Sequence, residues 1–153
     1  MSEIGSLKKV KLNLPFKQFG PDSTVSEIAD IMDLQDIGAV PVVDENNQLM
    51  GVLSERDIVR KLVKNGRDSD LVTAKDIMTS KVITVTKKTS QIDAFNLMKS
   101  NKIRHLPIVD EDQKLINFIS IRDIVDSSQG GKKLNFILLG FAVILLAAIL
   151  IFN

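Results

Sequence analysis

Two corners of the sequence combine a hydroxyl and a carboxylate at a spacing that suits the binding of a sugar. Ser54 and Asp57 belong to one Ser-x-Arg-Asp motif, and Ser120 and Asp123 belong to a second. A carboxylate can accept both hydrogens of a ribose cis-diol through two charge-assisted hydrogen bonds, and the serine hydroxyl can reach ribose or phosphate. The same spacing forms a capping box at the start of a helix. The residues leave both roles open, because one side chain can serve in both.

A basic pair, Arg104 and His105, stands before an apolar run in the second half of the chain. An arginine can pair with phosphate, and the histidine can contact phosphate or a base. The alternative is a solvated arginine beside a partly buried histidine that is bonded to the backbone. The matching residues of the first half, Gly38 and Ala39, carry no charge.

Both corners lie in an internal repeat with an offset of 66 residues. Between residues 37–59 and 103–125, eleven of 23 positions are identical without gaps. A repeat this regular predicts two copies of one supersecondary unit. One copy alone would be small for a stable core, so we expect the two copies to bury a shared face.

Each copy carries the signals for a strand, a helix, two strands and a second helix. The expected strands lie at 16–19, 40–43, 49–53, 82–85, 106–109 and 115–119. The expected helices follow the capping residues Thr24, Ser54, Ser90 and Ser120. Along the helix after Ser54, we expect the apolar residues Ile58, Val59, Leu62 and Val63 to face inward.

Composition argues against several classes of function. Basic and acidic residues nearly balance at 20 and 19, so no footprint for a nucleic-acid polymer is evident. The chain has no cysteine and one histidine, which argues against a metal site built by the protein. It has no nucleophile elbow, P-loop or dinucleotide fingerprint. We therefore expect no enzymatic activity.

The last part of the chain differs sharply from the rest. All 39 charged residues precede Leu134, and residues 134–152 are apolar apart from Asn135. As a helix this segment would span about 28 Å, close to the ~30 Å hydrocarbon core of a bilayer, although a buried core helix is the alternative. Residues 129–133 read as a flexible linker. Lys132 and Lys133 predict a single-pass C-terminal anchor with the preceding part in the cytoplasm.

The repeated residues resemble the CBS domain pair, or Bateman module. The motifs that carry the resemblance lie at 38–44, 51–59, 75–79 and 104–110. The resemblance covers about residues 10–128 and implies an α+β fold of tandem, pseudo-twofold-related units. The expected divisions are an N-terminal tail at 1–9, CBS motifs at 10–64 and 76–128, and a linker at 65–75. Asn117 replaces Gly51 in the second copy, and we expect this change to be harmless because asparagine tolerates a left-handed backbone.

The resemblance also implies adenosine nucleotides or S-adenosylmethionine in clefts between the units, and assembly into a homodimer. The expected ligand contacts are Ser54, Asp57, Ser120, Asp123, Arg104 and His105, with Gly38, Ala39 and Val40 as the matching strand of the first copy. Ile83, Thr84 and Leu106 are candidates for contact with the adenine through backbone bonds and apolar walls, and ordinary strand core is the alternative for each of these side chains. Because of its basic pair, we expect the second copy to hold the phosphorylated end of a nucleotide. The first copy would be weaker or prefer an uncharged adenosyl ligand.

Two functions follow from these observations. The first is a membrane-tethered regulatory module that binds AMP, ATP or S-adenosylmethionine, needs no obligatory cofactor, and signals to a partner protein. The second is a ligand-free dimerisation scaffold at the membrane. A stabilising response to adenosyl compounds would separate the two.

Overall fold

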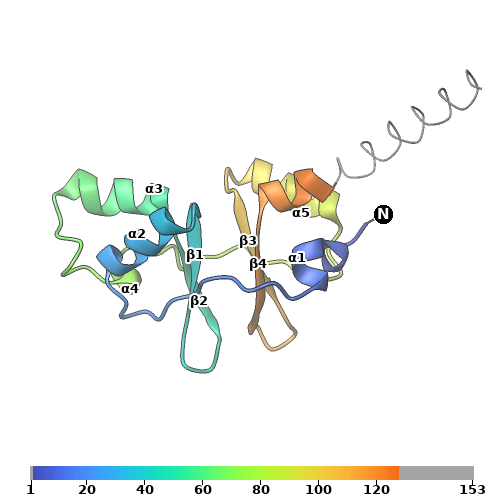
Figure 1. Ribbon diagram of the computed structural model, residues 1–153, viewed down its shortest axis with the longest axis horizontal. Coiled ribbons are helices and arrows are strands. Elements are labelled where there is room, and N and C mark those ends of the chain that lie inside the picture. The colour runs from blue at the N-terminus through green and yellow to red at the C-terminus, as the bar shows by residue number, and fades with distance from the viewer. Residues whose placement is uncertain (1, 128–153) are drawn as a thin grey trace, which may run out of the picture.

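The computed structural model describes residues 2–127, which form two similar units side by side (Figure 1). The helices within this range lack the length and apolar character that a membrane-spanning segment requires. The predicted linker at 129–133 and the predicted transmembrane helix at 134–152 lie outside the described residues, so the anchor remains a prediction from the sequence.

The first unit consists of a hairpin covered on its outer side by helices. Helix α2 (Val25–Leu34) precedes the antiparallel strands β1 (Ala39–Val43) and β2 (Leu49–Ser54), and α4 (Ala74–Ile77) lies on the same side of the sheet (Figure 1). As predicted, the Thr24 hydroxyl caps α2 by accepting the backbone N–H of Glu27 at 3.2 Å. Buried apolar side chains of the helices and the sheet form one core.

The second unit repeats this arrangement. Helix α5 (Gln91–Ser100) precedes the strands β3 (His105–Val109) and β4 (Leu115–Ser120), and residues 121–127 are helical. The register of the hairpin matches that of the first unit, because His105 pairs with Ser120 as Ala39 pairs with Ser54. These two α+β units confirm the tandem repeat that the sequence predicts.

The helix that begins after Ser54 changes its winding within one turn. Helix α3 (Glu55–Asp57) continues as a π-helical turn (Ile58–Leu62) and ends in a 3₁₀ turn (Val63–Asn65). Leu62 is buried, but Val59 and Val63 are 59% and 62% exposed. The prediction that both valines face inward is wrong, because the wider π turn spaces residues differently around the axis from the α-helix that the pattern assumed.

The first strand of each copy is reduced to a single bridge. The sequence predicts strands at 16–19 and 82–85, but only one residue of each segment pairs with the neighbouring hairpin. The Phe19 N–H donates to the Pro41 carbonyl at 3.2 Å, and the next bond of a parallel ladder would need an N–H on Pro41. Proline has none, and the same obstacle recurs at Pro107 in the second copy. The ladder therefore stops after one residue.

The N-terminal residues are part of the second core. We expected a tail at 1–9, but the chain forms a 3₁₀ turn (Ile4–Ser6) and helix α1 (Lys8–Lys11) there. Ile4 and Leu7 are 0% and 2% exposed and pack with the apolar side chains of the second unit. A segment from the start of the chain thus completes the unit at its far end, as Figure 1 shows.

Gly51 is required by packing rather than by a left-handed backbone. A Cβ atom on Gly51 would lie 2.5 Å from Met78 Sδ and 3.1 Å from the Thr79 carbonyl oxygen. Among the described glycines only Gly66 has a positive φ. Our expectation that Asn117 is tolerated because this position needs a left-handed backbone is therefore wrong. Asn117 is fully buried, and its Nδ2 has no hydrogen-bond partner within the described part of the chain.

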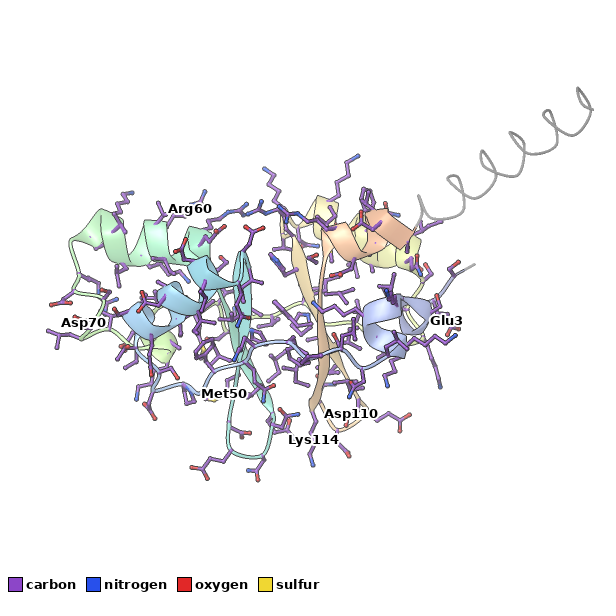
Figure 2. All side chains as sticks on the ribbon, viewed as in Figure 1. Glu3, Met50, Arg60, Asp70, Asp110 and Lys114 are labelled. Atoms are coloured by element: carbon purple, nitrogen blue, oxygen red, sulfur yellow. The ribbon has the colours of Figure 1, made fainter. Side chains whose placement is uncertain are left out.

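The tips of the two hairpins hold the units together at one end of the molecule. The Leu115 N–H donates to the Asn47 carbonyl at 3.0 Å, and the Asn47 side chain donates to the Leu115 carbonyl at 2.8 Å. Figure 2 places Asp110 and Lys114 at this end, and Arg60 at the opposite end. The Ser-x-Arg-Asp corners lie at the ends of β2 and β4 away from the tips, where Arg56 Nη1 of the first unit donates to the Lys102 carbonyl of the second at 2.8 Å.

Candidate ligand-binding clefts

Two cavities lie between the units, one at each Ser-x-Arg-Asp corner. The Asp57 cleft has a volume of about 390 Å³ and the Asp123 cleft about 300 Å³. Each is lined by residues of both units. The walls of the Asp57 cleft include Ser54, Thr79, Lys81, Val82, Ile83 and Ile103. The walls of the Asp123 cleft include Lys9, Phe16, Lys17, Ile37, Phe118 and Ser120.

The repeat explains why the two clefts match. Val82 and Ile83 of the second unit line the cleft of the first unit's Asp57. In the same way Phe16 and Lys17 of the first unit line the cleft of Asp123. Each corner is therefore completed by the extended segment of the other copy. A molecule that fills either cleft would contact both units at once.

Most of the predicted contacts reach these clefts. Gly38, Ala39, Arg104 and His105 line both cavities, while Ser54, Asp57 and Ile83 line one and Ser120 and Asp123 line the other. Val40 and Leu106 do not belong with them, because both are fully buried in the two cores. Thr84 is half-buried beside Ile83, and it is absent from the described walls of both clefts.

The carboxylate of Asp57 is held by four hydrogen-bond donors. Ser54 donates its backbone N–H (3.0 Å) and its hydroxyl (2.6 Å) to Oδ2, which completes the predicted capping box. On Oδ1, Lys61 Nζ lies at 2.8 Å and the Thr79 hydroxyl at 3.1 Å. Burial opposes the ionisation of Asp57, but these bonds and the charge of Lys61 hold its pKa below the ordinary value of 3.8. Asp57 is therefore an anion with its acceptor positions filled.

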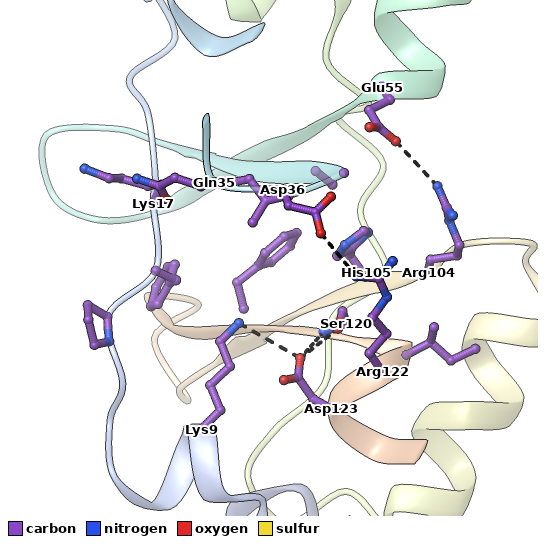
Figure 3. Close-up of a pocket in the computed structure, with 17 residues that line it drawn as sticks. Lys9, Lys17, Gln35, Asp36, Glu55, Arg104, His105, Ser120, Arg122 and Asp123 are labelled. Carbon is purple, nitrogen blue, oxygen red and sulfur yellow. Dashed lines mark hydrogen bonds and ion pairs between the residues drawn. The ribbon is translucent and has the colours of Figure 1, made fainter. Parts of the chain in front are cut away.

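The carboxylate of Asp123 has an open side. Ser120 donates its backbone N–H (2.6 Å) and its hydroxyl (2.9 Å) to Oδ2, and Lys9 Nζ stands 4.0 Å from the same oxygen (Figure 3). Within residues 2–127 no donor is bonded to Oδ1. That oxygen can accept a hydroxyl from a ligand without displacing a protein group. The Asp123 corner can therefore act as a cap and as a sugar contact at the same time.

His105 stands between the two clefts as a neutral ring. It stacks on Phe118 with a centroid separation of 5.5 Å and an interplanar angle of 5°. Burial, together with the nearby charges of Arg104 and Lys9, lowers the pKa of His105 to about 4. An uncharged imidazole at neutral pH offers one donor and one acceptor and an aromatic face, which suits a base or a hydroxyl better than it suits a phosphate.

The charges of the two clefts differ, and in the opposite sense from our prediction. The residues that line the Asp57 cleft include six basic residues and one acidic residue, while those of the Asp123 cleft include four basic and three acidic. Arg104 borders both, so it cannot distinguish them. The cleft with the greater excess of positive charge belongs to the first copy, which we expected to be weaker or to prefer an uncharged adenosyl ligand.

Sequence reasoning missed the residues that each copy lends to the other. The offset of 66 relates Phe16 and Lys17 to Val82 and Ile83, so symmetry could have identified Phe16 and Lys17 once Ile83 was chosen. Lys9 carried no such signal, because it comes from the segment that we expected to be a tail.

Comparisons with known proteins agree with this architecture. The model of the CBS domain family matches residues 10–64 and 74–130. A protein of Methanopyrus kandleri is 42% identical over 105 residues, which is 69% of this chain and 54% of that protein. A mitochondrial CBS domain-containing protein of Arabidopsis thaliana is 40% identical over 108 residues, which is 68% of this chain and 52% of that protein. The chain thus spans about half the length of these curated relatives.

Solved structures share the fold over most of the chain. A signal-transduction protein with CBS domains from Burkholderia ambifaria superimposes with a TM-score of 0.76 at 32% identity, covering 83% of this chain and 93% of that one. Two more distant neighbours were solved with ligands: CBSX2 with AMP (TM-score 0.71, 24% identity, 86% of this chain and 99% of that one), and a CBS domain pair with 5′-methylthioadenosine and S-adenosyl-L-methionine (TM-score 0.72, 23% identity, 86% and 98%). The repeated hairpins and the family match over both copies show that the chain belongs to the CBS domain family and carries a pair of CBS motifs.

Proposed function

We propose that this chain is a non-catalytic regulatory module that binds an adenosyl ligand, such as AMP, ATP or S-adenosylmethionine, between its CBS motifs. The observation that carries the proposal is the Asp123 cleft. It places the open Oδ1 of a carboxylate in one cavity with the apolar side chains of Phe16 and Ile37. A nucleoside needs this combination, with an acceptor for its ribose hydroxyls and apolar walls for its base.

Two structural neighbours support the chemical class of the ligand. The complexes of CBSX2 with AMP and of a CBS pair with 5′-methylthioadenosine and S-adenosyl-L-methionine have this fold. Their identity to this chain is low, so they support the fold that holds the ligand. For this chain, the corner residues Ser120 and Asp123 themselves support an adenosyl ligand.

Signalling would follow from the way both clefts are built. A ligand in either cavity contacts both units, while the units hold each other directly at the hairpin tips. Binding would favour the relative orientation of the units in which both walls reach the ligand. The ligand can shift this equilibrium only by its difference in affinity for the two orientations.

The setting of the module is a further part of the proposal. The apolar segment 134–152 would tether the chain to a membrane, and Lys132 and Lys133 would keep the CBS pair in the cytoplasm. A tethered homodimer could then act on a partner protein in the same membrane. The support for this setting comes from the sequence pattern alone.

Thermal unfolding of the full chain in detergent micelles tests the proposal. AMP, ATP, S-adenosylmethionine and 5′-methylthioadenosine should each be tested, with guanosine triphosphate as the control for nonspecific charge. A ligand at a hundred times its dissociation constant adds about 2.7 kcal/mol to the free energy of unfolding, which raises Tm by several degrees. If none of the adenosyl compounds raises Tm, the chain is better described as a ligand-free scaffold.

A further inference from the structure

The Asp57 cleft contains cations that no protein carboxylate neutralises. Arg60, Lys81 and Lys102 line it, and within residues 2–127 none of the three has a carboxylate within ion-pair distance. Like charges gathered around one cavity repel each other, and an anion that enters the cavity relieves this repulsion. The three side chains come from the helical stretch after Ser54, from the segment before Val82 and from the loop before β3.

The Asp123 cleft lacks this excess. Arg104 Nη2 lies 3.7 Å from Glu55 Oε2, and Arg122 Nη1 lies 3.7 Å from Asp36 Oδ2, as the dashed lines in Figure 3 show. These pairs are exposed and weak, but they place negative charge at the mouth of the cleft. These carboxylates would repel an incoming phosphate, whereas they would not repel a neutral adenosyl group.

Lys61 closes the Asp57 corner to a simple sugar. Its Nζ is 2.8 Å from Asp57 Oδ1 and also donates to the Ile77 carbonyl at 2.7 Å. A carboxylate offers about four acceptor positions, and Ser54, Lys61 and Thr79 use as many. A ribose hydroxyl can bond Asp57 only if Lys61 or Thr79 leaves. The second copy has Ser127 at the position of Lys61, so the Asp123 corner has no such lysine.

We propose that the Asp57 cleft takes an adenosine polyphosphate and that Lys61 makes it selective for this class of ligand. A phosphate held by Arg60, Lys81 and Lys102 offers Lys61 a new anionic partner inside the same cavity. Lys61 then leaves Asp57, and the carboxylate becomes available to the ribose. This inference rests on the proposed function and assigns the phosphorylated ligand to one of its two clefts.

The selectivity follows from the ion pairs that each ligand can form after Lys61 has left Asp57. The side chain of Asp57 is 13% exposed, so a partly buried carboxylate that loses Lys61 without compensation is costly. A neutral adenosyl compound offers Lys61 no anion. To reach Asp57 it must therefore break the ion pair between Asp57 and Lys61 without forming a new one. A triphosphate replaces the lost ion pair with a new one and satisfies three further cations, so it gains where the neutral compound loses.

Binding of ATP and of 5′-methylthioadenosine, measured by calorimetry on the full chain in detergent micelles, tests the inference. An Asp123→Ala background removes the ribose contact of the other cleft, so that the Asp57 cleft dominates. In this background ATP should bind more tightly than 5′-methylthioadenosine. Lys61→Met should reduce the preference for ATP over 5′-methylthioadenosine by about tenfold or more, the contribution of one charge-assisted hydrogen bond, chiefly because 5′-methylthioadenosine then reaches Asp57 without breaking the pair with Lys61.

A second variant keeps the test decisive if Lys61→Met does not fold. Lys81→Ala with Lys102→Ala removes two cations that make no ion pair in the protein, and it should weaken ATP by more than tenfold. Lys99→Ala, which removes an exposed lysine of α5 that lines neither cleft, is the matched control and should leave ATP binding unchanged. The inference is overturned if Lys81→Ala with Lys102→Ala leaves ATP binding unchanged, or if ATP and 5′-methylthioadenosine bind the Asp57 cleft equally. Binding of neither compound to the unmodified chain would instead contradict the proposed function.

Discussion

Removal of the Asp57 carboxylate should destabilise the protein more than removal of Asp123, although the sequence gives the two residues the same motif. Asp57→Ala removes the capping box with Ser54, the bond from Thr79 at 3.1 Å and the ion pair with Lys61 at 2.8 Å. The cap contributes about 1 kcal/mol, and the other two bonds together about 2 kcal/mol. We expect a loss of about 3 kcal/mol.

Asp123→Ala is the matched control because it removes the equivalent cap and only a distant cation. Ser120 is its partner at 2.6 and 2.9 Å, and Lys9 stands 4.0 Å away. The expected loss is about 1 kcal/mol. Thermal unfolding of the full chain in micelles, followed by circular dichroism, measures both variants. Equal losses would show that the bonds from Lys61 and Thr79 add nothing to stability, which would refute the argument.

The same comparison has a dependence on pH with a definite sign. The pKa of Asp57 in the folded protein is lowered from 3.8, despite the opposing effect of burial, by its bonds to Lys61 and Ser54. A lowered pKa contributes stability that is fully present above the ordinary value and is lost as the pH falls through the lower value of the folded state. The difference between Asp57→Ala and the unmodified chain should therefore narrow below about pH 4 and stay constant between pH 6 and pH 8.

Three further substitutions test the fold and the ring between the clefts. Leu7→Ala should cost about 2 to 4 kcal/mol in unfolding free energy, because Leu7 is 2% exposed in the second core; a true tail would show no change. Gly51→Ala should cost about 1 to 3 kcal/mol by forcing Met78 aside, and an unchanged Tm would contradict this packing argument. The unmodified chain should lose stability as the pH falls from 6.5 towards 4, because the unfolded chain protonates His105 first. His105→Phe, which preserves the stack on Phe118, should flatten this part of the pH profile, and an unaltered profile would count against burial of the imidazole.

The repeated unit could be predicted because its signals are local and occur twice. The capping residue Ser54, the hairpin around Asn47 and the start of β1 near Pro41 were found at positions that the structure confirms. Pro41 also limits the strand expected at 16–19 to a single bridge. The pattern of apolar residues could not show this. The effect of a missing N–H on a ladder can be predicted only when the partner strand is known, and the tertiary fold determines that partner.

The clefts could be predicted only in part, because they depend on contacts between the copies. Asp57 and Asp123 share a motif. The sequence does place Lys61 four residues after Asp57, the spacing of a helical ion pair, but it could not show that Thr79 also bonds this carboxylate. Nor could it show that α1 brings Lys9 to the second. We expected Leu106 at the adenine through backbone bonds and an apolar wall, and Val40 at the matching position of the first copy. In a strand, however, neighbouring side chains point to opposite faces, and these two point into the cores.

A crystal structure of the chain with an adenosine nucleotide is the most direct test of the central claim, which is that the two Ser-x-Arg-Asp corners hold ribose in clefts between the units. We expect the nucleotide in at least one of the two cavities, with a ribose hydroxyl within hydrogen-bonding distance of Asp57 or Asp123. A nucleotide bound elsewhere on the molecule, or bound here with its ribose turned away from both carboxylates, would contradict the account.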